Sequence, residues 1–334
     1  MGIRSGGKLF SSVEDISFDI RPGEILGILG ESGSGKTLTA LSIPGLLAEN
    51  KVITGGEIFF TGKNLLTTAE KEMEAIRGRE ISMVFQEPFS SLNPLLKIGE
   101  QIAETAELHS VGLHSESDLS IKKILPRSTR SFTEKKNKSL IKDQVMELMD
   151  KLNLPEPEKL MEAYPHRLSG GMCQRVMIAL STMSKPRLLI ADEPTTALDH
   201  NTQSQIIDFL KEINLDFGTS ILIISHDLEV VKNICSRVLV MYSGRILEEG
   251  KTEEVFSNPS HEYTKGLLAS IPDKTNKGKV LAAIPGRIPS LEEGRPSGCP
   301  FHPRCKKAGP DCKGEFPAKR SVSATHTSCC RYHE

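Results

Sequence analysis

A glycine-rich stretch near the start of the chain carries residue types that bind phosphate. Residues 30–37 read GESGSGKT, which fits the pattern G-x-x-x-x-G-K-T. The apolar run of residues 24–30 comes before it, and residues 37–42 continue as a pattern typical of a helix start. A strand, a tight turn and a helix in this order are the context in which the pattern forms a phosphate-binding loop.

The residue types in this loop predict how it would bind a nucleotide. Glycines let the backbone approach phosphate without a Cβ in the way, and successive N–H groups at a helix N-terminus attract the anion. Lys36 is expected to neutralise the β- and γ-phosphates, and the Thr37 hydroxyl to bind Mg²⁺. The predicted ATP-binding residues are Gly30, Glu31, Ser32, Gly33, Ser34, Gly35, Lys36 and Thr37.

Three further apolar runs end in polar residues that suit hydrolysis. Asp192 and Glu193 end the run 187–193, and we expect Asp192 to hold Mg²⁺ and Glu193 to polarise the attacking water. A positioned base of this kind contributes on the order of 10²–10⁴-fold in rate. His226 ends the run 220–226 and is predicted to sense the γ-phosphate, because ligands gather at the carboxyl ends of parallel strands. Gln86 ends a shorter run and is predicted to contact Mg²⁺ and water.

The order of the motifs resembles the nucleotide-binding subunit of an ABC transporter. GESGSGKT, Gln86, LSGGM at 168–172, LLIADE at 188–193, TALD at 196–199 and His226 occur in family order. The resemblance implies an α/β fold of the P-loop NTPase class, with a mixed core sheet, a helical subdomain and a small cysteine-containing tail. It also implies that two subunits sandwich two nucleotides. Ser169, Gly170 and Gly171 would then cap ATP held by the partner, and Asp199 would link the two sites.

Other segments are similar to the dipeptide and oligopeptide importer branch of that family. They are residues 163–168, 191–199, 240–245, 258–264 and 284–290. The resemblance implies an ATPase that powers uptake of short peptides, with nickel and glutathione importers as close alternatives. It implies three kinds of partner: a second ATPase subunit, for which the family favours a paralogue, two transmembrane permease subunits, and an extracytoplasmic solute-binding protein.

Composition limits the function classes. The net charge of −1 gives no bulk electrostatic reason to expect nucleic acid as a partner. The chain has no run of about 20 apolar residues that would span a bilayer, and its N-terminus lacks the apolar core of a signal peptide. We therefore expect the chain to stay in the cytosol, and the resemblance to an importer implies a peripheral place at the cytoplasmic face of the cell membrane. A soluble ABC ATPase acting on nucleic acid or ribosomes is the rival, although such chains usually carry coiled coils or two fused cassettes.

The sequence predicts two regions. Residues 1–258 would form the nucleotide-binding domain, with its helical subdomain at about 87–186, and residues 259–334 an accessory region. An amphipathic helix is expected over 202–213, and a hairpin over 238–249 that turns at Ser243 and Gly244.

Four cysteines in the tail have the residue types of a metal site. They are Cys299, Cys305, Cys312 and Cys330. The importer branch that the chain resembles carries such cysteines, implicated in a four-iron four-sulfur cluster. Four thiolates also suit structural zinc, and the spacing lacks a C-x2-C pair, so zinc and a metal-free tail stay open. Cys329 could replace Cys330 as a ligand, although the spacing His326-x3-Cys330 favours Cys330. A redox sensor is a third hypothesis for the function.

Three features depart from the family pattern. Phe10 does not fit the spacing of the aromatic residue that stacks on adenine. Either the stack is lost, which predicts weaker ATP binding, or the recorded start codon lies too far downstream. Cys173 stands where this branch often has arginine, and it and Cys235 are expected to be packed thiols. Residues 120–142 are a basic insertion, for which a solvated loop and a contact with anionic lipid are both open.

Overall fold

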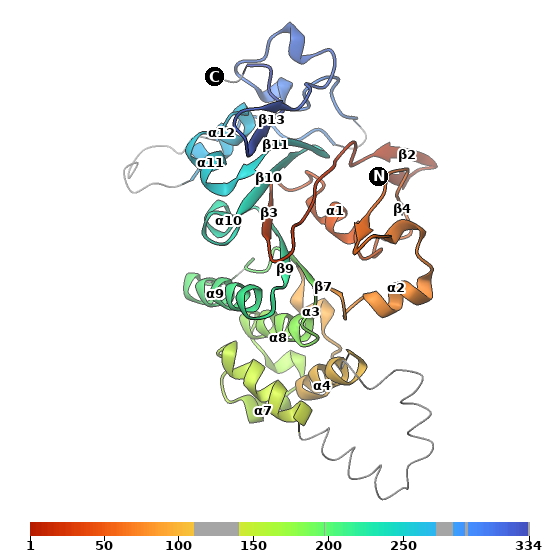
Figure 1. Cartoon of the computed structure of the whole chain (residues 1–334), viewed down its shortest axis with the longest axis vertical. Helices are drawn as coiled ribbons and strands as arrows, with labels where there is room; N and C mark the ends of the chain where they lie inside the picture. The colour runs from red at the N-terminus through yellow and green to blue at the C-terminus, as the bar shows by residue number, and fades with distance from the viewer. Residues whose placement is uncertain (110–139, 197, 272–282, 291–292, 333–334) are drawn as a thin grey trace, which may run out of the picture. The chain divides into compact units, whose positions relative to one another are not determined.

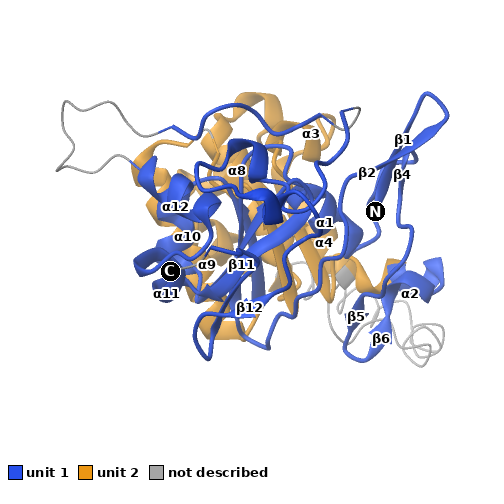
Figure 2. Ribbon diagram, turned by 90° about the horizontal axis from the view of Figure 1, so that it is seen from above, with its two compact units in different colours: residues 1–73, 220–334 blue, residues 74–219 orange. Residues whose placement is uncertain are grey.

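The computed structural model describes residues 1–109, 140–196, 198–271, 283–290 and 293–332 (Figure 1). The chain forms two compact units, one of residues 1–73 and 220–334, and the other of residues 74–219 (Figure 2). These units do not test the predicted boundaries at 87, 186 and 258, which stay predictions. The predicted insertion at 120–142 lies almost entirely outside the described residues.

A mixed sheet forms the core of the first unit. Its strands follow the order β12-β13-β11-β10-β3-β9. Their bounds are β3 (Ile25–Leu29), β9 (Ser220–Ser225), β10 (Arg237–Tyr242), β11 (Arg245–Lys251), β12 (Arg320–Ser321) and β13 (His326–Ser328). β3 runs parallel to β9 and β10, whereas β11 runs antiparallel to β10 and β13. Every residue of β3, β9 and β10 is buried, which explains why apolar residues make up most of each strand.

Helices and small sheets complete the first unit. Its helices are α1 (Lys36–Ser42), α10 (Leu228–Ile234), α11 (Thr252–Ser257) and α12 (Glu262–Ala269). α1 packs against β9, and α10 packs against β3 and β9. The small sheets pair β1 (Gly2–Ser5) with β2 (Lys8–Ser11) and β4 (Lys51–Val52), and β5 (Phe59–Phe60) with β6 (Lys63–Asn64). α2 (Glu70–Ile76) follows them in the chain.

The hairpin predicted over 238–249 is confirmed. Tyr242 pairs with Arg245, so Ser243 and Gly244 form a two-residue turn. Both have positive φ, 45° at Ser243 and 77° at Gly244. This is the backbone that a two-residue turn needs to follow the right-handed twist of its strands, and Gly244 adopts it without steric cost.

A buried ion-pair network ties β10 and β11 to the chain before β3. The Arg237 side chain is 10% exposed, and its Nε donates to Glu24 Oε1 at 2.8 Å. Its Nη1 donates to Glu249 Oε1 at 2.6 Å. Burial by itself would raise the pKa of Glu24. The hydrogen bond from Arg237 and its positive charge act in the opposite direction, and the net effect is a lowered pKa. A guanidinium at this depth is stable because carboxylates satisfy its donors.

The second unit combines two parallel strands with helices. β7 (Ile81–Val84) pairs with β8 (Leu188–Asp192). Its helices are α3 (Pro88–Ser91), α4 (Ile98–His109), a helix at 140–151, α7 (Pro157–Met161), α8 (Gly170–Thr182) and α9 (His200–Phe217). The helix predicted over 202–213 is therefore present and longer, because Asp199 caps its start and Gly218, at φ 66°, ends it. None of the helices in the described part of the chain has the length and apolar character to cross a membrane.

Candidate nucleotide site and cysteine pocket

The phosphate loop begins where β3 ends and finishes where α1 begins, as the motif predicts. Two of its glycines are required by close packing. A Cβ on Gly30, whose φ is 158°, would lie 2.1 Å from the Met241 carbonyl oxygen. A Cβ on Gly35, at φ 100°, would lie 2.8 Å from Val13 Cγ2. The loop thus adopts its tight path only because these positions carry no side chain.

Lys36 lies inside this loop. Its side chain is buried, and Nζ donates to the Gly30 carbonyl at 2.7 Å and to the Glu31 carbonyl at 3.0 Å. The Ser34 hydroxyl is also buried and has no hydrogen-bond partner among the described residues. A buried ammonium group and an unsatisfied hydroxyl at the N-terminus of α1 are suited to an anion. Thr37, the predicted Mg²⁺ ligand, is half-buried in the first turn of α1.

His226 follows the strand that pairs with β3. Leu29 and Ser225 are Cα partners in the parallel pair of β3 and β9. Gly30 and His226 therefore leave the sheet at the same edge, and the His226 side chain is exposed there. The predicted sensor histidine and the phosphate loop thus belong to the same edge of one sheet. Phe10 lies half-buried in β2, and its predicted failure to stack on adenine stays a prediction.

In the second unit, the predicted base has defined partners. Glu193 follows β8 and has a φ of 50°, which is uncommon for a residue with a side chain. Its Oε2 accepts hydrogen bonds from Gln86 Nε2 at 3.1 Å and from Thr196 Oγ1 at 2.9 Å. The structure therefore joins two predicted residues, Gln86 and Glu193. It adds Thr196, to which the sequence analysis gave no role although it lies in the TALD motif. Asp192, 2% exposed, ends the buried strand.

The LSGG motif lies at the N-terminus of α8, as predicted. Ser169 is the N-cap, and its Oγ accepts the N–H of Met172 at 3.3 Å. Gly170 and Gly171 form the first turn, and a Cβ on Gly171 would contact Leu198 at 3.4 Å. The absence of side chains leaves this helix end open to an anion.

Asp199, predicted to link two nucleotide sites, has a local role in the structure. Its carboxylate accepts the Thr202 N–H at 3.0 Å and the Thr202 hydroxyl at 2.6 Å. These hydrogen bonds lower the pKa of Asp199 and keep it charged at the start of α9. A role between subunits stays a prediction.

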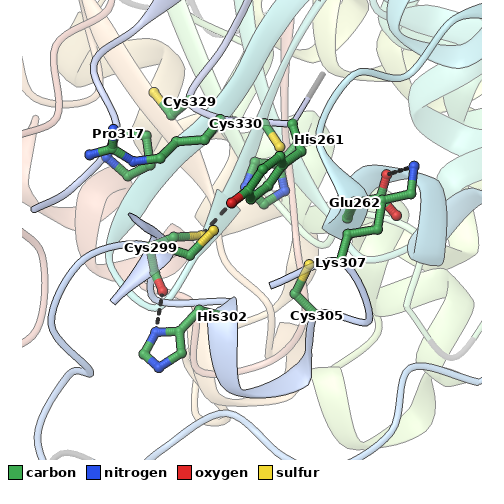
Figure 3. A pocket seen from close by; sticks show the side chains of 12 residues that line it. His261, Glu262, Cys299, His302, Cys305, Lys307, Pro317, Cys329 and Cys330 are labelled. Atoms are coloured by element: carbon green, nitrogen blue, oxygen red, sulfur yellow. Dashed lines mark hydrogen bonds and ion pairs between the residues drawn. The ribbon is translucent and has the colours of Figure 1, made fainter. Parts of the chain in front are cut away.

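The four predicted cysteine ligands line one pocket of the tail. Cys299, Cys305 and Cys330 line it together with His261 (Figure 3), and Cys312 is a further lining residue. The Nε2 atom of His261 lies 3.7 Å from Cys299 Sγ. Cys299 N–H also donates to the Cys312 carbonyl at 2.9 Å. His261 was not among the predicted ligands, although it lies in residues 258–264, one of the segments similar to the peptide importers. Among the described residues, however, no three His, Cys, Asp or Glu side chains are grouped so that they could hold one metal ion.

The charges around these thiols distinguish Cys330 from Cys329. Burial raises the pKa of Cys299 to about 12, and the neighbouring thiols Cys312, Cys330 and Cys305 contribute to the rise. Cys329 also lines the pocket, and burial raises its pKa to about 11, while the positive charges of Lys319 and Arg245 act to lower it. Cys330 is therefore the better companion of the other three thiols. Cys173 and Cys235, expected to be packed thiols, are both buried.

Hydrogen bonds to the buried carboxylate of Glu248 hold one wall of the pocket in place. Glu248 Oε1 accepts from the Ser260 N–H at 2.6 Å and lies 2.7 Å from His326 Nε2, while Glu248 Oε2 accepts from the His261 N–H at 3.0 Å. Strand β11, the start of α12 and strand β13 are thereby joined through one side chain. Glu248 was not predicted from the sequence, because a lone glutamate within a strand carries no local signal of burial.

A glycine loop between a buried parallel strand and a helix, with a carboxylate pair after a second buried strand, defines a P-loop ATPase. A sequence profile described as "ABC transporter" matches residues 13–196, and one described as "Oligopeptide/dipeptide transporter, C-terminal region" matches residues 247–312. The chain belongs to the ABC transporter family.

Curated relatives agree over most of the chain. The oligopeptide transport ATP-binding protein OppD of Salmonella typhimurium is 43% identical, over 92% of this chain and 84% of the relative. The dipeptide transport ATP-binding protein DppD of Escherichia coli is 37% identical, over 97% of this chain and 91% of the relative. Among solved structures, the ATP-binding cassette MJ0796, a dimer in a post-hydrolysis state bound to ADP and Pi, is similar with a TM-score of 0.61 and 25% identity. The matched region covers 75% of this chain and 95% of the MJ0796 chain. The predicted fold class is confirmed.

Proposed function

We propose that this chain is the ATP-hydrolysing subunit of an importer of short peptides. The observation that carries the proposal is the match of residues 247–312 to the C-terminal region of oligopeptide and dipeptide transporters. This region follows the matched cassette, residues 13–196, in the chain, so the resemblance to peptide transporters is independent of the ATPase motifs. The names of the relatives from Salmonella typhimurium and Escherichia coli support the same cargo class.

The loop residues and the carboxylates divide the chemistry of hydrolysis between them. The backbone of residues 30–35 and the ammonium of Lys36 bind the phosphates. Glu193 accepts a proton from the attacking water, and Gln86 and Thr196 hold its carboxylate in place. His226 senses the γ-phosphate and orients the water. Thr37, Gln86 and Asp192 would hold Mg²⁺, which neutralises charge on the phosphates when bound.

Assembly supplies what one chain lacks. The open helix end at Ser169, Gly170 and Gly171 caps ATP bound by a second ATPase subunit, and a paralogue suits that position. Asp199 joins the two nucleotide sites. Two membrane permease subunits receive the movement at the cytoplasmic face of the membrane, and an extracytoplasmic solute-binding protein delivers the cargo. No part of this proposal calls for nucleic acid.

The cargo is tested by the ATPase rate of the assembled transporter in proteoliposomes. We expect the solute-binding protein loaded with short peptides to raise hydrolysis severalfold above the rate with the empty binding protein. Nickel and glutathione, offered at the same concentration, should not raise it. Stimulation by nickel or glutathione alone would instead overturn the peptide proposal and leave the ATPase assignment intact.

We further propose that Cys299, Cys305, Cys312 and Cys330 hold a four-iron four-sulfur cluster. The support is that four thiols of the right type line one pocket, although the described side chains are not grouped at ligating positions. All four thiols must lose their protons to bind iron. Burial, which raises the pKa values of Cys299, Cys305 and Cys330, opposes this until a metal supplies positive charge. Such a cluster would brace a tail rich in loops.

Anaerobic purification with an absorption spectrum and iron, sulfide and zinc analysis tests the cluster. We expect brown protein with about four irons per chain, as a Cys₄ cluster requires. Cys330→Ser should lose most of the iron, whereas Cys329→Ser, the matched control next to it, should keep it. Colourless protein without iron, or equal losses in the two variants, would contradict the assignment. One zinc per chain would replace the cluster with a structural zinc site.

A further inference from the structure

Glu31, the second residue of the phosphate loop, is held at three points. Its carbonyl accepts a hydrogen bond from Lys36 Nζ at 3.0 Å, within the loop. Its N–H donates to the Tyr263 hydroxyl at 2.9 Å. Its carboxylate is held by Arg304. Two of the three partners therefore come from the accessory region that follows the cassette.

The contact between Arg304 and Glu31 is bidentate. Nη1 donates to Oε2 at 2.7 Å and Nη2 donates to Oε1 at 3.1 Å. The Arg304 side chain is only 7% exposed. A planar guanidinium matched to a carboxylate in this way fixes orientation as well as charge, which a lysine could not do. The carboxylate of Glu31 is thus both neutralised and immobilised.

The guanidinium is itself fixed by the tail. Arg304 Nε donates to the Pro285 carbonyl at 2.7 Å, and Nη2 donates to the Ile284 carbonyl at 3.3 Å. Nη1 also donates to the Tyr242 hydroxyl at 3.2 Å. The backbone carbonyls of the tail therefore fix the Arg304 guanidinium in the position from which it binds Glu31.

Aromatic packing holds the second contact. Tyr263 is fully buried, with its ring centroid 4.7 Å from that of Tyr242 and 5.3 Å from that of Phe301. Packing on both neighbours fixes the hydroxyl that accepts the Glu31 N–H. Tyr263 follows His261 and Glu262, and Arg304 precedes Cys305, so both contacts arise from segments that also line the cysteine pocket.

A carboxylate in a phosphate loop creates an electrostatic problem. ATP carries several negative charges, and a free Glu31 carboxylate beside it would repel the ligand, most strongly in a partly buried loop. A mobile Glu31 side chain would also add to the conformational entropy lost on binding. The bidentate pair with Arg304 removes both costs before ATP arrives.

We propose that Arg304 is a positioning residue for the phosphate loop, and that it sets ATP affinity by neutralising and holding Glu31. The inference rests on the proposed assignment of residues 30–37 as the ATP site. Under it, the accessory region takes part in nucleotide binding through the side chain of Arg304, in addition to any role of its cysteines.

A double-mutant cycle on the full-length chain tests this role. The dissociation constant for ATP with Mg²⁺ is measured for Arg304→Ala in two backgrounds, wild type and Glu31→Gln. We expect Arg304→Ala to raise this dissociation constant about tenfold in the wild type. In the Glu31→Gln background the same substitution should raise it by at most about threefold, because the harm comes from the unpaired carboxylate. Arg287→Ala is the matched control, since Arg287 pairs with Glu293 in the same tail but is 75% exposed. It should bind ATP as the wild type does.

Several outcomes would overturn the inference. An Arg304→Ala variant with normal affinity removes it, and so does an equal loss in both backgrounds, which would mean that Arg304 only holds the tail. In the assembled transporter, the KM for ATP should rise while kcat at saturating ATP stays within about twofold. A fall in kcat alone would count against a role in positioning the loop.

Two further variants keep the test decisive. If Arg304→Ala fails to fold, Arg304→Glu and the charge swap Glu31→Arg with Arg304→Glu replace it. The swap should recover most of the affinity lost in Arg304→Glu, and no recovery would refute the pairing. Lys36→Ala separates the two levels of the argument. Normal ATP binding in Lys36→Ala would refute the loop assignment itself. Lost binding in Lys36→Ala, together with equal effects of Arg304→Ala in the two backgrounds, would refute only the role of Arg304.

Discussion

Glu193→Gln is expected to lower ATP hydrolysis by the assembled transporter at least about 100-fold, because the amide cannot accept a proton from the attacking water. ATP binding should survive, since glutamine has nearly the same shape as glutamate. Its amide oxygen can still accept the hydrogen bonds that Gln86 and Thr196 donate to Glu193 Oε2. The rate of phosphate release and the dissociation constant for ATP, measured on the same preparation, separate the two effects.

A control variant and a contrary result make this test specific. Glu147→Gln removes an exposed carboxylate on the helix at 140–151, where Glu147 pairs with Lys151 at 3.6 Å. It should hydrolyse ATP at the wild-type rate. Full turnover in Glu193→Gln would show that another group takes the proton, and it would leave Glu193 with a structural role at its unusual backbone position.

Local patterns in the sequence predicted local structure well. The phosphate loop, the hairpin at Ser243 and Gly244, and the helix start at Ser169 each depend on residues a few positions apart, where backbone preference and capping decide the outcome. The predicted helix over 202–213 was too short because only its apolar positions were counted. Its ends are set by Asp199 and Gly218, which are polar or small and lie outside that pattern.

Contacts between distant segments could not be predicted in this way. Gln86 and Glu193 are 107 positions apart, and Arg304 and Glu31 are 273 positions apart. No periodicity or spacing links such pairs, because the whole sheet and tail must fold before the side chains meet. Glu248 shows the same limit, since its burial follows from the tail strand β13 that pairs beside β11.

Lys36→Ala should weaken ATP binding about 100-fold or more, because charge-assisted hydrogen bonds contribute roughly 1.5–3 kcal/mol each and the ammonium would make more than one to the phosphates. The variant should remain folded. Alanine favours the helix that begins at this position, and the two carbonyl contacts that Lys36 makes, to Gly30 and Glu31, contribute roughly 1.5–3 kcal/mol each, so we expect a lower melting temperature without loss of the fold. Titration with a fluorescent ATP analogue and a thermal melt together measure both expectations.

Lys63→Ala, which removes an exposed lysine paired with Glu72 at 3.4 Å, is the control for loss of positive charge and should bind normally. Tight binding by Lys36→Ala would mean that the buried ammonium serves only to close the loop on its own carbonyls, and ATP would then have to bind elsewhere on the chain.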